Sequence, residues 1–149
     1  MEYHIRAMQE QDIPFVSQIE NQIFSLPCSE KSFRDAAANP YNVYLVCECT
    51  GEIAGYCGMW TVMGEGNVTN VAVHPAYRRM GVAEALLKEM EKKAKEKDVT
   101  IFFLEVRQSN EAAKQLYNKL GYNPIGVRKR FYEKPVEDAI VMSKTTYTV

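Results

Sequence analysis

Residues 67–91 read NVTNVAVHPAYRRMGVAEALLKEME, and this stretch decides the fold. Its first part, up to His74, alternates apolar residues and predicts a β-strand. From Ala83 to Ala94, apolar residues recur at helical spacing and predict a helix with one apolar face. The next apolar run, VTIFFLEV at 99–106, predicts a strand that is covered on both sides. Strand, helix and strand then form a βαβ unit with parallel strands and a right-handed crossover.

Shorter signals predict five elements before this unit. YHIRAM at 3–8 indicates an early strand, and apolar spacing predicts a helix from Asp12, its cap, to about Phe24. Ser29 is the expected cap of a second short helix. Residues 41–49 and 52–63 predict a hairpin of two strands around the turn Thr50-Gly51.

After the βαβ unit, the chain predicts one more helix and two strands. Ser109 is the expected cap of this helix, and Gly121 stands where a C-terminal glycine ends a helix. The strands are expected at about 122–129 and 139–146, around a loop rich in charge. The resulting order predicts a mixed α/β fold, with a mixed sheet and helices on both faces. A doubly wound dinucleotide-binding fold is disfavoured, because strands and helices do not alternate evenly.

Composition narrows the class of protein. The 149 residues suit one domain, 1–149, and 46% of them are hydrophobic. A formal net charge of -1 argues against a dedicated nucleic-acid binder. No apolar run reaches 18 residues, so we expect no membrane span. The polar N-terminus has no signal-peptide core, and we therefore expect a cytoplasmic protein.

Four cysteines raise the question of a metal site. They are Cys28, Cys47, Cys49 and Cys57, and the two histidines, His4 and His74, do not lie at zinc-finger spacing. Strand alternation places Cys47 and Cys49 on the same face. We expect reduced, mostly buried thiols and no metal.

The turn from Arg78 to Ala83 is the clearest candidate binding site. It has the pattern R-x-x-G-x-A at the start of a helix, where unpaired N–H groups and the helix dipole attract anions. Gly81 allows close approach to the backbone, so a phosphate or pyrophosphate is the natural ligand. The alternative is an ordinary helix start with two solvated arginines. The position of the loop, at the carboxyl end of a strand in a βαβ unit, favours the binding site.

Together, these residues resemble the GNAT superfamily of acetyl-CoA-dependent N-acetyltransferases. The resemblance rests on R-x-x-G-x-A after NVAVHP and on FLEVRQSNEAAKQLYNKLGY, and it covers nearly the whole chain. SLPCSEKSF, LEVRQSNEAAKQLYNKLGY and EDAIVM resemble the branch that acetylates the N-terminal alanine of a small-subunit ribosomal protein. Cys28 departs from that branch, which often has tryptophan there. If this residue shapes the peptide groove, the acceptor preference is open.

The resemblance implies positions that bind the cosubstrate acetyl-CoA. The backbone of Val71, Ala72 and Val73 would pair with the pantetheine arm as a false strand, while the valine side chains also serve the core. Asn110 would contact acetyl-CoA, unless it is only a residue at a helix start beside the cap Ser109. The expected pyrophosphate cradle consists of Arg78, Arg79, Met80, Gly81, Val82, Ala83 and Glu84.

Glu105 is the most informative single residue for catalysis. It ends an apolar run, where a carboxylate costs free energy unless it is paired or functional. A salt bridge to Arg107 on the same side of the strand is one interpretation, and a general base is the other. The resemblance favours the general base, acting directly or through a water.

Two tyrosines are further candidates. Tyr117 lies on the apolar face of its helix, so it is a core tyrosine or, as the resemblance implies, the proton donor to the departing CoA thiolate. Tyr132 is a candidate wall of the peptide groove. Arg128, Lys129 and Arg130 beside it are expected to be solvated.

These features predict an enzyme that acetylates a protein N-terminal α-amine, most readily the N-terminal alanine of a small-subunit ribosomal protein. Acetylation of a lysine or of a small-molecule amine is the alternative within the same fold. A CoA-binding module without catalysis is disfavoured, because Glu105 and Tyr117 are both present. RNA binding through residues 128–130 is weakened by the net charge and the absence of an aromatic platform motif. We expect a monomer or a weak homodimer.

Overall fold

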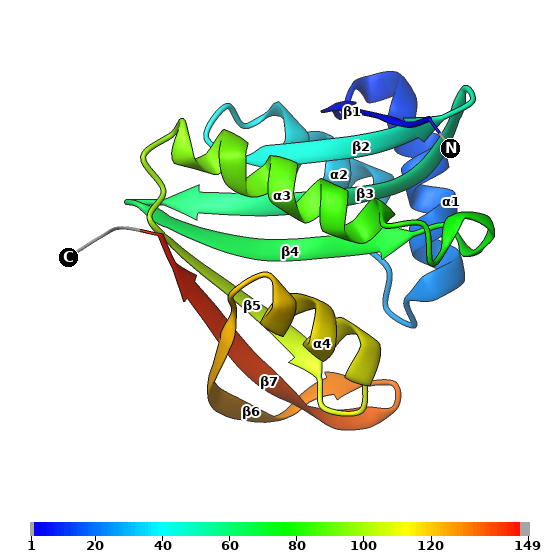
Figure 1. Ribbon diagram of the computed structural model, residues 1–149. Coiled ribbons are helices and arrows are strands. Elements are labelled where there is room, and N and C mark those ends of the chain that lie inside the picture. Colours follow the sequence, from blue (N-terminus) through cyan, green and yellow to red (C-terminus); the bar gives the residue numbers. More distant parts are fainter. Residues whose placement is uncertain (1, 147–149) are drawn as a thin grey trace.

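Seven strands form a single sheet in the computed structural model, which describes residues 2–146 (Figure 1). Their order across the sheet is β1-β2-β3-β4-β5-β7-β6. Among the described strands, only β4 and β5 pair in parallel; the other neighbours are antiparallel. The strands are β1 (His4–Ala7), β2 (Val43–Cys49), β3 (Glu52–Val62), β4 (Glu65–Val73), β5 (Ile101–Arg107), β6 (Asn123–Glu133) and β7 (Val136–Thr145).

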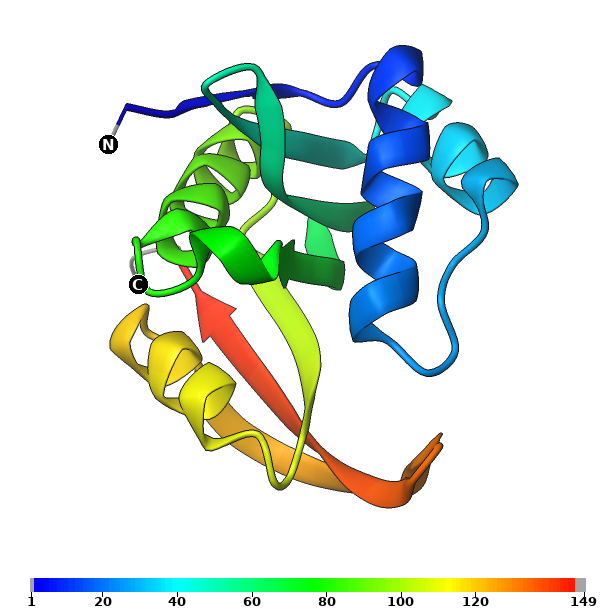
Figure 2. The ribbon, with the colours of Figure 1, turned by 90° about the vertical axis from the view of Figure 1, so that its right-hand side faces the viewer.

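Four α-helices cover the sheet in two layers. In Figure 2, α1 and α2 lie on one side of the sheet, and α3 and α4 lie on the other. Helix α1 contacts β3 and β4, and α2 contacts β2. The helices are α1 (Ile13–Ile23), α2 (Glu30–Ala38), α3 (Val82–Lys95) and α4 (Glu111–Lys119), with short 3-10 helices at Glu10–Asp12 and Pro75–Tyr77.

Alternating side chains divide the interior into two cores. On β2, Leu45 and Cys47 belong to the core beneath α3 and α4, whereas Tyr44 and Val46 belong to the core beneath α1 and α2. Cys49 joins the first of these cores with Cys47, so the prediction that both face the same way is confirmed. This two-sided burial explains why the central strands carry long apolar runs.

The sequence predicted the fold class and the order of elements correctly. The mixed sheet, the parallel β4-α3-β5 unit and the helices on both faces are all present. The prediction that β5 is covered on both sides was wrong. Phe102, Leu104 and Val106 are buried, while the alternate residues are only partly buried, because α1 and α2 lie over β3, β4 and β2 instead.

The charged loop predicted between the last two strands was also wrong. Strands β6 and β7 continue through it and turn tightly after Glu133. The register shifts between Arg128 and Tyr132, where the N–H of Arg130 donates to the Asp138 carboxylate at 2.9 Å. Because of this bulge, the charged residues can belong to strand β6 and need not form a loop. The composition of the segment alone could not predict the bulge.

Two predicted helix caps differ from those in the structure. Asn110 caps α4 in place of Ser109, because its side-chain oxygen accepts from the N–H of Ala113 at 3.1 Å. Asp12 precedes α1 but makes no side-chain cap; its carboxylate instead binds Arg6 through two hydrogen bonds. Ser29 caps α2, as predicted, and Gly121 has the positive φ of a C-terminal glycine.

Candidate active site

Strands β4 and β5 separate after a short paired segment, and their separation opens the sheet. They pair only from Glu65–Ile101 to Asn67–Phe103. Beyond these residues, β4 still pairs with β3 as far as Val73, and β5 still pairs with β7 as far as Arg107. The two edges that face each other therefore have backbone N–H and C=O groups with no strand partner, which an extended ligand could satisfy.

A bulge in β4 explains why the strands separate. Met59 pairs with Val68 and Gly58 with Asn70, so Thr69 is the extra residue. A bulge bends its strand and turns side chains to a different face. Val68 belongs to the core beneath α3, whereas Ala72 lies in the core beneath α1.

Val71, Ala72 and Val73 stand at this opening, as the false-strand prediction requires. Val71 and Val73 pack against the core beneath α3. Their side chains thus serve the core while one edge of their backbone has no strand partner. The structure is consistent with both roles given to these residues, and pairing with a pantetheine arm stays a prediction.

The loop between β4 and α3 has the geometry of an anion site. Arg79 has φ +63° and Gly81 has φ +77°, and Gly81 is the N-cap of α3 without a side-chain hydrogen bond. Within the described residues, no hydrogen bond uses the N–H groups of residues 79–84; the first is from Ala85 to the Gly81 carbonyl at 3.0 Å. Apart from Gly81 and its two neighbours in the chain, no residue has an atom within 4 Å of the place where a Cβ of Gly81 would stand. Free N–H groups in an open turn can bind phosphate oxygens.

The charged side chains of this loop differ in their surroundings: the arginines are exposed, whereas Glu84 forms an ion pair. Arg78, Arg79 and Met80 are exposed, and Arg78 Nε donates to the Val73 carbonyl at 3.4 Å. Glu84 does not face the loop as a free charge. Its Oε1 lies 2.8 Å from Lys119 Nζ on α4, and this cation lowers the pKa of Glu84 below its ordinary value. Glu84 can therefore bind an anion only through its backbone N–H, which can donate a hydrogen bond.

Glu105 pairs with Arg128, and the salt bridge to Arg107, which was the alternative to the general base, is absent. Arg128 Nε lies 3.6 Å from Glu105 Oε1, and the Glu105 side chain is 28% exposed. The expectation that Glu105 is buried was wrong, because no helix covers this face of β5. Glu105 is thus an accessible carboxylate on the α1 side of the sheet, which suits contact with an acceptor.

Arg107 instead fixes the β6–β7 hairpin. Its guanidinium donates to Glu137 at 3.1 Å and to the Pro135 carbonyl at 3.0 Å. It also lies 4.3 Å from the ring centre of Tyr132, a cation–π contact. Burial and the nearby Glu105 raise the pKa of Tyr132 above its ordinary value. Tyr132 is therefore a half-buried, oriented ring on the same side as Glu105.

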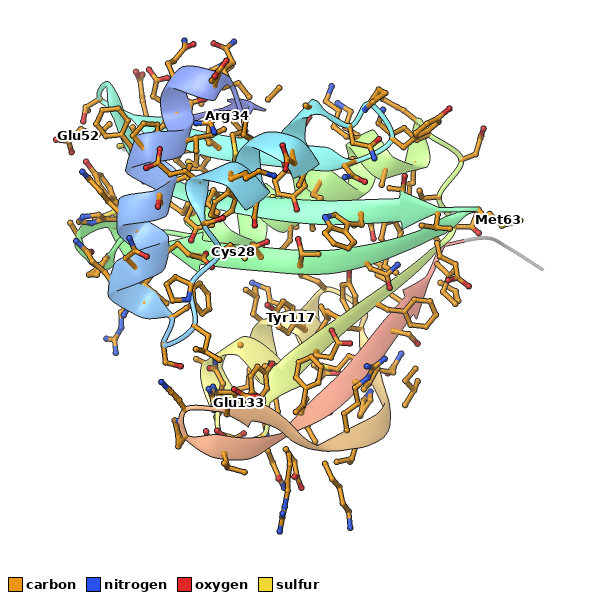
Figure 3. The ribbon with its side chains drawn as sticks, turned by 180° about the vertical axis from the view of Figure 1, so that it is seen from behind. Cys28, Arg34, Glu52, Met63, Tyr117 and Glu133 are labelled. Atoms are coloured by element: carbon orange, nitrogen blue, oxygen red, sulfur yellow. The ribbon has the colours of Figure 1, made fainter. Side chains whose placement is uncertain are left out.

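Tyr117 is buried at the end of α4. The N–H of Tyr122 donates to its carbonyl at 2.9 Å and that of Gly121 to Asn118 at 3.0 Å, a Schellman motif that sets the end of the helix. Burial raises the pKa of Tyr117 to about 12, and Tyr132 adds to this shift. No hydrogen bond of the described residues uses its hydroxyl. Figure 3 shows Tyr117 at the opening between β4 and β5.

Asn110 lies at the start of α4 and is exposed. Its side-chain oxygen is occupied by the N–H of Ala113. The capping role that the sequence offered as the alternative is thus present. Its amide nitrogen makes no hydrogen bond among the described residues and is available to a ligand.

Sequence reasoning missed a buried polar cluster on the α1 side of β4. Glu20 on α1 is 2% exposed and accepts from the Tyr56 hydroxyl at 2.5 Å and from the Cys28 N–H at 2.9 Å. Asn70 donates to Glu20 at 3.4 Å and to the Cys28 sulfur at 3.7 Å. One signal was present in the sequence: Glu20 lies four residues after Val16, on the apolar face of its helix.

The four cysteines are free thiols, and Cys28 is the half-buried one. Within residues 2–146, no group of three or more His, Cys, Asp or Glu side chains could hold a metal ion. None of the helices described in this range has the length and apolar character needed to cross a membrane.

A family model for the GNAT acetyltransferases matches residues 13–122, which include the opening, the loop before α3, Glu105 and Tyr117. The chain belongs to the GNAT family. This GNAT protein is an acetyl-CoA-dependent N-acetyltransferase, as the sequence predicted.

Within the family, its similarity is to one branch. Over 139 residues, it is 42% identical to a Bacillus subtilis protein provisionally named [ribosomal protein bS18]-alanine N-acetyltransferase, covering 93% of this chain and 92% of that one. It is 35% identical over 143 residues to the Escherichia coli enzyme of that name, with 93% and 95% covered. The crystal structure of the Escherichia coli ribosomal-protein-S18-alanine N-acetyltransferase superposes with a TM-score of 0.90 at 30% identity, covering 99% of this chain and 96% of that one.

Proposed function

We propose that this GNAT enzyme transfers the acetyl group of acetyl-CoA to the α-amine of the N-terminal alanine of ribosomal protein bS18. The observation that carries the proposal is the similarity, over 93% of the chain, to relatives that bear this name. The opening between β4 and β5 supports it, because Glu105 on β5 and Tyr117 on α4 both lie beside it. Residues of both elements belong to the core beneath α3 and α4.

The cosubstrate would bind along three structural elements. The free N–H groups of residues 79–84 would donate hydrogen bonds to the pyrophosphate oxygens, and Arg78 and Arg79 would add positive charge. The backbone of residues 71–73 would pair with the amide groups of the pantetheine arm. The amide nitrogen of Asn110 would be a further contact.

Acetyl transfer needs one proton acceptor and one proton donor. The amine attacks the thioester carbonyl, and Glu105 accepts the proton that the nitrogen loses, directly or through a water. The C–S bond then breaks, and Tyr117 donates a hydrogen bond or its proton to the leaving sulfur. A pKa of about 12 keeps the Tyr117 hydroxyl protonated at neutral pH, as a donor must be.

The α-amine is the better acceptor on chemical grounds. A protein α-amine has a pKa of about 8, whereas lysine has one of about 10.4, so more of the α-amine is neutral at pH 7. Tyr132, together with the loop between α1 and α2, would form the walls of the peptide groove. This loop and the tip of the β6–β7 hairpin lie close together in Figures 1 and 3.

Mass spectrometry tests the proposal. The purified protein is incubated with acetyl-CoA and two peptides: one begins with the N-terminal alanine of bS18, and the other has a blocked terminus and an internal lysine. Acetylation of the α-amine alone is the expected result. Acetylation of the lysine alone would overturn the acceptor assignment and favour the alternative, a lysine or small-molecule amine acetyltransferase.

A further inference from the structure

The cluster of Glu20, Tyr56, Asn70 and Cys28 has a charge without a counterion. All donors to the Glu20 carboxylate are neutral, namely a hydroxyl, a side-chain amide and a backbone N–H. No cation among the described residues forms a salt bridge with Glu20. Burying a charge in this way costs free energy.

A second buried carboxylate in the same part of the chain shows the contrast. Asp12 is 4% exposed and forms a two-point ion pair with Arg6, at 2.7 and 2.9 Å. Asp12 therefore has the pairing that is usual for a buried charge. Glu20 has no such cation, and neutral donors alone hold its oxygens.

Glu20 determines which way the Asn70 side chain faces. A carboxylate only accepts hydrogen bonds, so the Asn70 amide must turn its nitrogen toward Glu20 and its oxygen away. The Asn70 oxygen makes no hydrogen bond with any described residue. The residue is also not completely sealed from solvent. Asn70 itself is 8% exposed.

If the proposed function holds, the position of Asn70 in β4 places its side-chain oxygen near the reacting groups. Asn70 is the first residue after the bulge in β4 and immediately precedes residues 71–73. An arm that starts at the loop 79–84 and runs back along Val73 and Val71 brings its reactive end to Asn70. Across the opening, Glu105 is two residues beyond Phe103, the last β5 residue paired with β4.

We propose that Asn70 binds the acceptor amine through its side-chain oxygen, with Glu20 and Tyr56 as positioning residues. The amine offers N–H donors, and the two acceptors that face it are the Asn70 oxygen and the Glu105 carboxylate. Glu20 holds the amide in the orientation that presents oxygen to the N–H groups of the amine. The site therefore selects a primary amine over a neutral group of the same shape.

Calorimetry in the presence of CoA tests this selection. The acceptor peptide is compared with an analogue in which a propanoyl group replaces the terminal alanine, so that only the amine is missing. We expect Asn70→Ala to weaken binding of the amine peptide about tenfold or more, as for a lost hydrogen bond to a charged group, and to leave the analogue unchanged. Glu20→Gln should produce a smaller loss of the same kind, because a glutamine lets the amide turn. Glu20→Gln also tests the proposal if Asn70→Ala does not fold.

Asp12→Asn is the matched control, since it changes a buried carboxylate away from the opening. It should lower the melting temperature without changing the preference for the amine peptide. Equal losses for both peptides in Asn70→Ala, a parallel loss of CoA affinity, or an unchanged preference in Glu20→Gln and Asn70→Ala would overturn the proposal. A wild type that binds the amine selectively but transfers no acetyl group would instead overturn the proposed function and leave this inference standing.

Discussion

Glu105 pairs with Arg128, two strands away in the sheet, and not with Arg107, its neighbour two residues along β5. The distinction matters because the two arginines are held differently. Arg107 is anchored by Glu137, by two backbone carbonyls and by the ring of Tyr132. Arg128 is 61% exposed and has one ion pair, with Glu105. An acceptor can therefore displace Arg128 from Glu105 without disturbing the hairpin.

Replacing Glu105 with Gln tests its role as the general base. Glutamine keeps the size of the side chain but cannot take up the proton of the amine. We expect kcat/KM for the acceptor peptide to fall by about 10²- to 10⁴-fold at neutral pH, the usual contribution of general base catalysis. The KM for acetyl-CoA should stay the same. A variant with the full rate at pH 7 would remove Glu105 from this role.

Arg128→Ala should improve binding of the acceptor. The guanidinium competes with the incoming amine for Glu105, and exposed ion pairs of this kind contribute about 0.2–1 kcal/mol. We therefore expect the KM for the acceptor to fall by at most about fivefold at low ionic strength. The difference should disappear in high salt, which screens exposed charges.

Lys129→Ala serves as its control, because Lys129 is an exposed neighbour on the same strand. Its removal should leave the KM unchanged. A higher KM in Arg128→Ala would mean that Arg128 binds the acceptor, contrary to the expected competition.

Tyr117→Phe should slow the chemical step and alter stability only in alkali. Without the hydroxyl, the leaving sulfur loses its donor, and we expect kcat to fall about tenfold or more. In the folded protein, the pKa of Tyr117 is about 12, whereas its ordinary value is 10. Below pH 10 the phenol is protonated in both the folded and unfolded states. Above it, the unfolded state releases its proton first, so stability falls as the pH rises through about 12.

Denaturant unfolding at several pH values measures this effect. Between pH 10 and 12, the free energy of unfolding of the wild type should fall by up to about 2.7 kcal/mol more than that of Tyr117→Phe. This figure follows from about 1.36 kcal/mol for each of the two pKa units. Parallel loss of stability in the two proteins would contradict the assigned burial of the hydroxyl. An unchanged kcat in Tyr117→Phe would reduce Tyr117 to a core residue.

Gly81→Ala should weaken binding of acetyl-CoA. Gly81 has φ +77°, so an alanine there is strained by about 1–2 kcal/mol, and its methyl group enters the space before the N–H groups of α3. We expect the KM for acetyl-CoA to rise about tenfold.

Gly51→Ala is a matched control for strain. Gly51 has φ +83° and likewise has no residue other than its chain neighbours within 4 Å of its Cβ position, but it lies in the β2–β3 turn. Gly51→Ala should lose about as much stability as Gly81→Ala but keep the KM of the wild type for acetyl-CoA. The same KM change in both variants would show that strain, not the anion site, is responsible.

The candidate site could be predicted only in part. The loop 78–83 could be proposed as an anion site because glycine, arginines and a helix start are adjacent in sequence, and Gly81 has a positive φ in the structure. The catalytic roles of Glu105 and Tyr117 stay predictions; the burial expected for Glu105 was wrong, and the ion-pair partner is Arg128 in place of the alternative, Arg107. Asn70 was missed altogether, since its contact with Glu20 joins residues 50 positions apart.

The sequence by itself determined the order of strands and helices, the parallel βαβ unit and the glycine at the start of α3. These features depend on local periodicity and on the φ angles that single residues tolerate. Only the tertiary structure decided where β4 and β5 separate, which arginine pairs with Glu105 and which buried carboxylate remains without a cation. The bulge at Thr69 shifts the register of β4 against β3, and the bulge in β6 shifts its register against β7. Such shifts change which side chains meet across the sheet, and local sequence patterns do not reveal them.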